Sequence, residues 1–205
     1  MSEAQDATVF IIDDDKEVRE AIELLMQSIG LPAKTYASAK EYLEQFDADI
    51  PGVLVLDVRM KGMSGLALQE HLNNLPLTPP VIIITGHGDV PMAVQAVQNG
   101  AANFIEKPFN EQVLLDSIHR ALEVDAKQRG KAIKIAEIQA RLDKLTRRER
   151  QVIEYVVKGE RNKSIASKLN ITQSTVEAHR AKAMEKLQAK SLSELMRIMI
   201  SINPE

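Results

Sequence analysis

The sequence of 205 residues contains neither cysteine nor tryptophan, and only 3% of its residues are aromatic. The absence of cysteine excludes disulfides, thiolate metal sites and thiol nucleophiles, and it agrees with a reducing compartment. Long apolar runs are also absent, since none approaches the ~20 residues that a membrane-spanning helix needs. The first residues do not show the basic and then apolar order of a signal peptide. We therefore expect a cytoplasmic protein that makes no contact with a membrane.

Basic residues are scarce in the first part of the chain, and acidic residues are scarce in the second. Residues 1–125 hold 8 Lys and Arg against 20 Asp and Glu, a balance of −12, whereas residues 126–205 hold 18 against 9, a balance of +9. Such a switch indicates two domains with different partners, of which the basic one is a candidate for binding nucleic acid. Charge alone leaves open a basic surface that is merely solvated.

Short apolar runs alternate with helical patterns over the first 125 residues. The runs at 9–13, 53–57 and 81–85 are almost continuously apolar, which is typical of strands buried on both faces. Weaker strand signals lie at 33–36 and 103–106. Because a helical pattern follows each run, the order predicts an α/β domain with a doubly wound, five-stranded parallel sheet.

Beyond the expected sheet the pattern is helical and basic, with an interruption predicted at Gly130. After residue 145 no strand pattern occurs, and capping signals such as Thr146–Glu149 mark four short helices. Two of them meet at the tight turn Asn170–Thr172, which is typical of a helix-turn-helix. We predict three segments: an α/β domain at 1–125, a helical linker at 126–142 and an all-α, four-helix helix-turn-helix domain at 143–205.

Carboxylates end two of the predicted strands, with Asp13 and Asp14 after the first and Asp57 at the end of the third. Open α/β sheets bind ligands at the edge where the carboxyl ends of parallel strands meet. Two carboxylates about 4 Å apart repel by roughly 1–4 kcal/mol, and a hard divalent cation such as Mg²⁺ relieves that repulsion. Thr85 and Lys107 follow the remaining strands to the same edge. A metal, a carboxylate nucleophile, a hydroxyl and an ammonium suit phosphoryl transfer to Asp57.

These residues resemble the receiver domain of two-component response regulators over about residues 6–125, and the run Ile84–Val94 is similar to the FixJ-type branch. The resemblance implies that Asp57 accepts phosphate from the phosphohistidine of a sensor kinase. It also implies a cis peptide between Lys107 and Pro108. Further roles are implied at single positions: Thr85 and Lys107 contact the phosphoryl group, Phe104 is the switch aromatic, and Mg²⁺ is bound by Asp14, Asp57 and the backbone carbonyl of Arg59, with Asp13 acting through water.

Two positions near this site carry expectations of their own. Lys61 stands in the loop after Asp57, where a proline is common in the family, so we expect a less rigid loop. The lifetime of the phosphoryl group does not follow from the sequence. His87 lies in a glycine-flanked loop without an evident partner, and we expect it to be a solvated or switch-surface residue instead of a catalytic base.

Residues 143–202 resemble the LuxR-type helix-turn-helix domain, on motifs such as Asn162–Ala166 and Thr175–His179. In that family the helix capped here by Thr172 is the recognition helix, whose first turns face base edges in the major groove. The candidates for base contact share its outward stripe: Ser174, Glu177, Ala178 and Ala181, with Thr175 beside them. The candidates for phosphate contact, which position a domain without reading sequence, are Lys163, Thr172, Arg180, Lys182 and Lys186.

The features together predict a response regulator of the FixJ and NarL type. We expect no enzymatic activity beyond self-phosphorylation and self-dephosphorylation. We also expect that phosphorylation drives homodimerisation, binding of double-stranded promoter DNA and activation of transcription with RNA polymerase. One alternative is a Mg²⁺-dependent aspartyl phosphatase, which needs a carboxylate where Arg59 stands. Another is a receiver whose output binds RNA or protein, although the basic module holds a single aromatic residue, Tyr155, for stacking on bases. The stimulus, the kinase, the operator, the target genes and the arrangement of the domains stay open.

Overall fold

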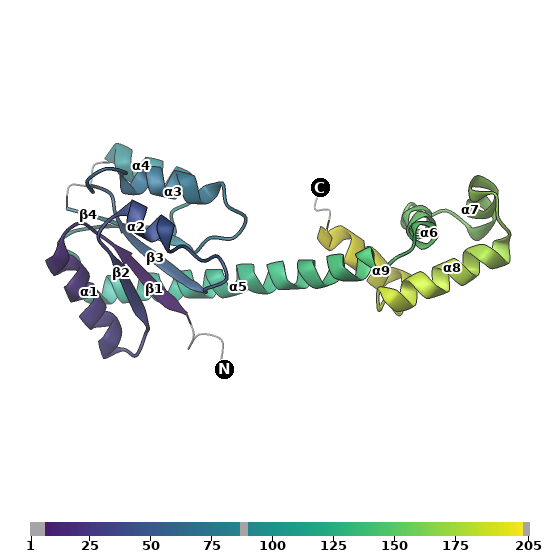
Figure 1. The fold of residues 1–205 in the computed structure, drawn as a ribbon, viewed down its shortest axis with the longest axis horizontal. Coiled ribbons are helices and arrows are strands. Elements are labelled where there is room, and N and C mark those ends of the chain that lie inside the picture. The colour runs from purple at the N-terminus through teal and green to yellow at the C-terminus, as the bar shows by residue number, and fades with distance from the viewer. Residues whose placement is uncertain (1–6, 87–89, 203–205) are drawn as a thin grey trace. The chain divides into compact units, whose positions relative to one another are not determined.

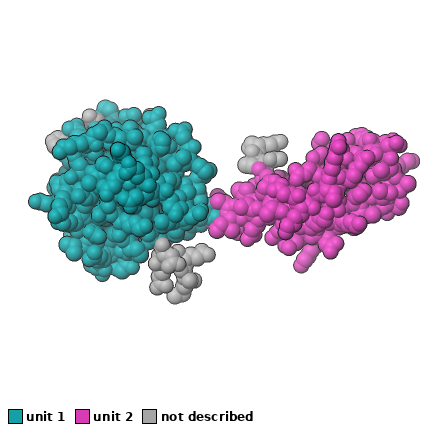
Figure 2. Space-filling model, viewed as in Figure 1, with its two compact units in different colours: residues 1–129 teal, residues 130–205 magenta. Residues whose placement is uncertain are grey.

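The computed structural model describes residues 7–86 and 90–202. The chain forms two compact units, residues 1–129 and residues 130–205, which Figure 2 colours separately. Within the described ranges, no helix has both the length and the apolar character that a membrane crossing requires.

A five-stranded parallel sheet with the order β2-β1-β3-β4-β5 is the frame of the first unit (Figure 1). Each strand is followed by a helix, in the order β1 (Thr8–Ile12), α1 (Lys16–Ser28), β2 (Ala33–Tyr36), α2 (Ala39–Glu44), β3 (Gly52–Asp57), α3 (Gly65–Asn73), β4 (Val81–Thr85), α4 (Val90–Gln98), β5 (Asn103–Glu106) and α5 (Glu111–Asp143). In the centre of the sheet Ile12 pairs with Leu56. Asp13 and Asp57 therefore leave neighbouring strands at the same level.

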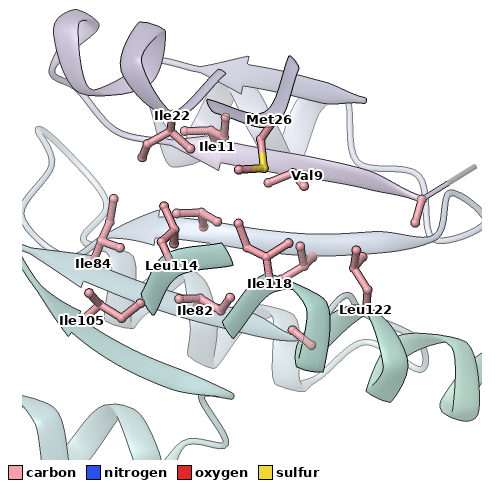
Figure 3. Packing of buried hydrophobic residues seen from close by; sticks show 14 residues of the cluster. Val9, Ile11, Ile22, Met26, Ile82, Ile84, Ile105, Leu114, Ile118 and Leu122 are labelled. Atoms are coloured by element: carbon pink, nitrogen blue, oxygen red, sulfur yellow. The ribbon is translucent and has the colours of Figure 1, made fainter. Parts of the chain in front are cut away.

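Alternate side chains of the strands face two separate hydrophobic layers. One layer packs Val9, Ile11, Ile82 and Ile84 of the strands against α1 and α5. In Figure 3, Val9 and Ile11 lie beside Ile22 and Met26 of α1, and Ile82 and Ile84 lie beside Leu114 and Ile118 of α5. The other layer packs Phe10, Ile12, Leu54, Leu56 and Ile83 against α2, α3 and α4. Because both faces are covered, the strands read as continuous apolar runs, which explains their strong sequence signal.

Two glycines are required by close backbone approach at the two ends of β3. A Cβ at Gly52 would lie 2.0 Å from the main-chain oxygen of Thr8 on the neighbouring strand. A Cβ at Gly65, the first residue of α3, would lie 2.2 Å from the main-chain oxygen of Asp57. Both distances are far inside van der Waals contact, so any larger side chain would displace the strand that carries Asp57.

An ion pair fastens α5 to the sheet at the end opposite the acidic residues. The buried Asp125 accepts a hydrogen bond from the main-chain N–H of Gly52, at 2.9 Å, and from Nε of Arg129, at 2.8 Å. Arg129 also donates to the main-chain oxygens of Ala48 and Ile50, at 2.7 and 2.9 Å. The pair joins one helix to the start of β3 and to the segment before it, and it uses four hydrogen bonds to do so.

In its described residues, the second unit consists of the end of α5 and four helices: α6 (Arg147–Val157), α7 (Asn162–Leu169), α8 (Gln173–Lys186) and α9 (Leu192–Ile202). The capping box predicted at Thr146 and Glu149 is present. Asn170 ends α7 in the left-handed conformation, with φ 53°, and Thr172 caps α8. The core includes Leu142 and Leu145 as well as residues of all four helices, so the end of α5 belongs to this fold.

The predicted architecture is confirmed: a doubly wound parallel sheet of five strands is followed by an all-α helix-turn-helix unit. The interruption expected at Gly130 is wrong, because α5 runs through it from Glu111 to Asp143. One glycine in a helix costs only about 1 kcal/mol relative to alanine, which the many helix-forming neighbours of Gly130 outweigh. The segment boundaries 1–125, 126–142 and 143–205 stay predictions.

Candidate functional site

The acidic residues predicted to meet at one edge of the sheet are brought together there. Asp13 follows β1, Asp57 ends β3, and Lys107 follows β5. The Nζ atom of Lys107 lies 2.6 Å from Oδ2 of Asp13 and 2.9 Å from Oδ1 of Asp57. Both carboxylates are nearly fully buried, with 1% and 5% of their surface exposed. Lys107 is thereby held between two carboxylates that come from different strands.

Asp14 completes an acidic cluster whose members can share one cation. Carboxylate oxygens of Asp13, Asp14 and Asp57 all lie within 4.8 Å of one another, and Asp14 is exposed to solvent. Three carboxylates against one ammonium leave a net charge of −2 at the site. That charge and the all-oxygen donor set fit a hard divalent cation such as Mg²⁺.

The electrostatics of Asp57 reflect a conflict between burial and charge pairing. Burial raises the pKa of Asp57 above its ordinary value of 3.8, and the hydrogen bond and charge of Lys107 oppose that rise. Burial alone would lower the pKa of Lys107, but its hydrogen bonds to Asp13 and Asp57 outweigh burial and raise it. At neutral pH the site therefore holds a charged lysine beside a carboxylate whose ionised form is destabilised by burial.

Of the remaining predicted receiver residues, Thr85 and Arg59 lie at the same edge, whereas Phe104 lies within β5, opposite Ile83 of β4. Thr85 ends β4 and is fully buried, and its main-chain oxygen accepts a hydrogen bond from the N–H of Lys107 at 2.7 Å. The main-chain N–H of Arg59 bonds to the carboxylate of Asp57 and lowers its pKa. Phe104, on β5, is partly buried against the layer that contains α4. The peptide between Lys107 and Pro108 is cis, as expected, whereas His87 lies outside the described residues. The individual roles assigned to these side chains stay predictions.

Arg19 belongs to the site and was not among the predicted residues. It lies on α1, and its Nη1 atom donates a hydrogen bond of 2.7 Å to the main-chain oxygen of Asp13. Asp15 caps the same helix, and its N–H donates to Oδ1 of Asp13 at 2.9 Å. These contacts hold the turn that presents Asp13 and Asp14. An arginine in the first turn of a helix that follows an acidic loop was the available signal.

We expect Asp57→Asn to stabilise the metal-free protein at neutral pH. Because the pKa of Asp57 is higher in the folded state than the ordinary 3.8, ionisation favours the unfolded chain. The free-energy penalty of ionising Asp57 in the folded state is absent well below pH 3.8. It grows as the pH rises from 3.8 to the folded pKa, and it is constant above the folded pKa. Urea unfolding with a chelator, at several pH values, measures the difference between the two chains. The assignment would be contradicted if the variant were less stable than the unaltered chain at neutral pH. It would also be contradicted if the free energies of unfolding of the two chains differed by the same amount at every pH.

The outward face of α8 carries most of the predicted DNA contacts. Val176, Ala183 and Leu187 are buried in the core of the unit. The base-contact candidates on the opposite stripe are exposed: Ser174, Glu177, Ala178 and Ala181. Lys163 and Lys182 are exposed as well, while Thr175 and Arg180 are half-buried. The accessible stripe fits a surface for duplex DNA, and the separate contacts stay predictions.

Five of the predicted DNA-contact residues already have side-chain partners within the unit: Thr172, Ser174, Thr175, Glu177 and Lys186. Thr172 accepts a hydrogen bond from the N–H of Thr175 as the cap of α8. Glu177 accepts one from Nδ2 of Asn162, at 3.3 Å. Lys186 forms an ion pair of 2.7 Å with the buried Glu149. Of the five, only Lys186 has its charged group committed to a buried partner.

Comparison with known proteins agrees with both halves of the structure. Residues 9–119 match the response regulator receiver domain, and residues 143–199 match the bacterial regulatory proteins of the luxR family. The chain is 45% identical over 197 residues to the transcriptional regulatory protein FixJ of Rhizobium meliloti, covering 96% of each chain. It is 41% identical over 192 residues to the response regulator protein TodT of Pseudomonas putida, covering 94% of this chain and 85% of that protein.

Solved structures extend the similarity to the whole chain. The response regulator StyR has a TM-score of 0.84 and 41% identity, covering 95% of this chain and 98% of that one. Full-length FixJ from B. japonicum has a TM-score of 0.57 and 36% identity, with 96% and 97% covered. Matched in both of its units and along nearly its full length, the chain belongs to the two-component response regulators that join a receiver domain to a LuxR-type DNA-binding domain.

Proposed function

We propose that this response regulator is a transcription factor gated by phosphorylation of Asp57. A carboxylate oxygen of Asp57 attacks the phosphorus of a sensor kinase's phosphohistidine, the bond from phosphorus to the imidazole nitrogen breaks, and the electron pair stays on the imidazole. The products are an aspartyl phosphate and an unmodified histidine. The observation that carries the proposal is the buried contact of Lys107 with both Asp13 and Asp57.

Lys107 serves the transfer by its charge and position. Its ammonium lies 2.9 Å from the attacking carboxylate, at the edge where a phosphoryl group would be added. A fixed cation in a buried site stabilises negative charge on phosphoryl oxygens more than it would in water. The hydroxyl of Thr85, the last residue of the adjacent strand β4, would contact the same group.

The donor set of the site supports a resident Mg²⁺. Asp14 and Asp57 would hold it with the backbone carbonyl of Arg59, and Asp13 would act through water. When bound, the ion neutralises charge on the carboxylates and polarises the phosphoryl oxygens. The chain's own contribution is the placement of the three carboxylates, which Arg19 and the cap at Asp15 support from the main chain.

Phosphorylation then acts on the face formed by α4, β5 and α5. Thr85 and Phe104 move toward the phosphoryl group, and the remodelled face forms a homodimer; such coupling needs only about 1–3 kcal/mol. Exposed valines on α4 support this surface, since 76% of Val90, 48% of Val94 and 59% of Val97 is accessible. The dimer binds double-stranded promoter DNA in the cytoplasm and activates transcription with RNA polymerase.

A gel-shift experiment tests the proposed function. The chain is incubated with Mg²⁺ and a small phosphodonor, and binding to promoter duplexes selected from a genomic library is measured over a range of salt concentrations. We expect tighter, salt-dependent binding to the duplexes after phosphorylation. Binding to single-stranded RNA but not to duplex DNA, or duplex binding that ignores the phosphodonor, would refute it.

A further inference from the structure

Lys186 occupies a junction within the second unit that its predicted role as a phosphate contact does not explain. Its Nζ atom lies 2.7 Å from Oε2 of Glu149 and 3.2 Å from the main-chain oxygen of Lys144. Glu149 is only 3% exposed, and the same Oε2 accepts the main-chain N–H of Thr146 at 2.8 Å. The ammonium of Lys186 is therefore bound to a buried carboxylate, although 35% of the lysine side chain is exposed.

The junction connects three segments of the unit. Lys186 is the last residue of α8, Glu149 lies in the first turn of α6, and Lys144 directly follows the end of α5. Arg150 adds a second link between α6 and the end of α5, since it donates a hydrogen bond of 3.0 Å to the main-chain oxygen of Leu142. One lysine thus ties the C-terminal end of the recognition helix to the start of α6 and to the end of the long helix.

The energetics favour a fixed junction. Glu149 is buried, and the hydrogen bond from Lys186 is the largest of the effects that lower its pKa. Removing one partner of a buried pair leaves the other charge uncompensated. Lys186 could reach a DNA phosphate only by leaving the buried Glu149 without its cationic partner, whereas Lys182, one turn earlier on α8, is exposed.

We propose that Lys186 is a positioning residue for DNA recognition, which orients α8 through Glu149 and the main chain of Lys144 and does not neutralise a DNA phosphate. The proposal rests on duplex binding by the LuxR-type domain. It predicts that substitution of Lys186 changes the difference in binding affinity between a specific DNA sequence and an unrelated one. A lysine that contacts phosphate contributes equally to the binding affinity for both sequences.

The test compares Lys186→Met with Lys182→Met, two variants on one helix that remove the same charge. Two duplexes serve as probes: one selected from a random library by the unaltered chain, and one of unrelated sequence. For Lys186→Met we expect a loss of roughly tenfold in affinity for the selected duplex, a smaller loss for the unrelated one and an unchanged salt slope. For Lys182→Met we expect similar losses on both and a slope reduced by about 0.9.

A pairing experiment with Glu149 makes the result sharper. Glu149→Gln is expected to lower the affinity for the selected duplex, and adding Lys186→Met to it is expected to cause little further loss, because the two act as one unit. Lys186→Arg is expected to restore part of the specificity. The proposal is overturned if Lys186→Met reduces the salt slope by about 0.9 with equal losses on both duplexes, or if it leaves binding unchanged.

A measurement without DNA separates this proposal from the proposed function. Amide hydrogen exchange at Thr146 and in the last turn of α8 is expected to accelerate in Lys186→Met and to stay unchanged in Lys182→Met. Equal exchange in the two variants would overturn the positioning role, whatever the chain binds. An unaltered chain that binds neither duplex would refute the proposed function, and the exchange data would still decide the role of Lys186.

Discussion

Asp57→Asn is expected to reduce incorporation of phosphate from a small phosphodonor such as acetyl phosphate from stoichiometric labelling to background. The amide that replaces the carboxylate is not a nucleophile toward phosphorus. Of the two carboxylates that bond to Lys107 in the described part of the chain, Asp57 is the one at the end of β3. Asn is nearly isosteric with Asp, so the buried pocket should keep its shape. The label is measured with radioactive phosphodonor in the presence of Mg²⁺.

Asp49→Asn is the matched control, because Asp49 is an exposed aspartate of the same unit outside the acidic cluster. It should retain full labelling, and hydroxylamine should release the label because an acyl phosphate reacts with it. Label that persists on Asp57→Asn would refute the assignment of Asp57. Label that resists hydroxylamine would place the phosphate on a side chain other than a carboxylate.

The receiver pocket was predictable because it follows from two local signals. Apolar runs located the strands, and the parallel order of the sheet brought the residues after each run to one edge. Asp13, Asp57 and Lys107 meet there at hydrogen-bond distance although they are far apart in the chain. The rule that carboxyl ends of parallel strands form the site needs no knowledge of side-chain contacts, which is why it works from sequence.

The contacts that support the sites were not predictable in the same way. Arg19, Asp125 and Lys186 are charged residues in helices, where solvent exposure is the usual expectation. Each is committed to a partner that the helix pattern does not identify: the main chain of Asp13, a helix neighbour together with the start of a strand, and a carboxylate 37 positions away. Only the packed tertiary structure shows which charged residues are used internally.

Arg129→Met is expected to destabilise the receiver unit by about 3–5 kcal/mol, the usual effect of removing one partner of a buried ion pair. The substitution leaves Asp125 charged and buried, with a side chain only 3% exposed, and it removes the donors to the main-chain oxygens of Ala48 and Ile50. Methionine preserves most of the apolar stem of arginine, so lost packing contributes little. Urea unfolding measures the loss, and amide exchange assigns it to β3 and α5.

Lys127→Met is the control, because Lys127 is an exposed cation on the same helix and should change stability by less than about 0.5 kcal/mol. Adding Asp125→Asn to Arg129→Met should recover part of the loss, since the uncompensated charge is gone while an amide oxygen remains for the N–H of Gly52. Losses that simply add, or an Arg129→Met chain as stable as the control, would show that the pair does not fasten α5. The acidic pocket lies at the other end of β3, so phosphate incorporation by folded Arg129→Met should persist, which separates this structural contact from the chemistry at Asp57.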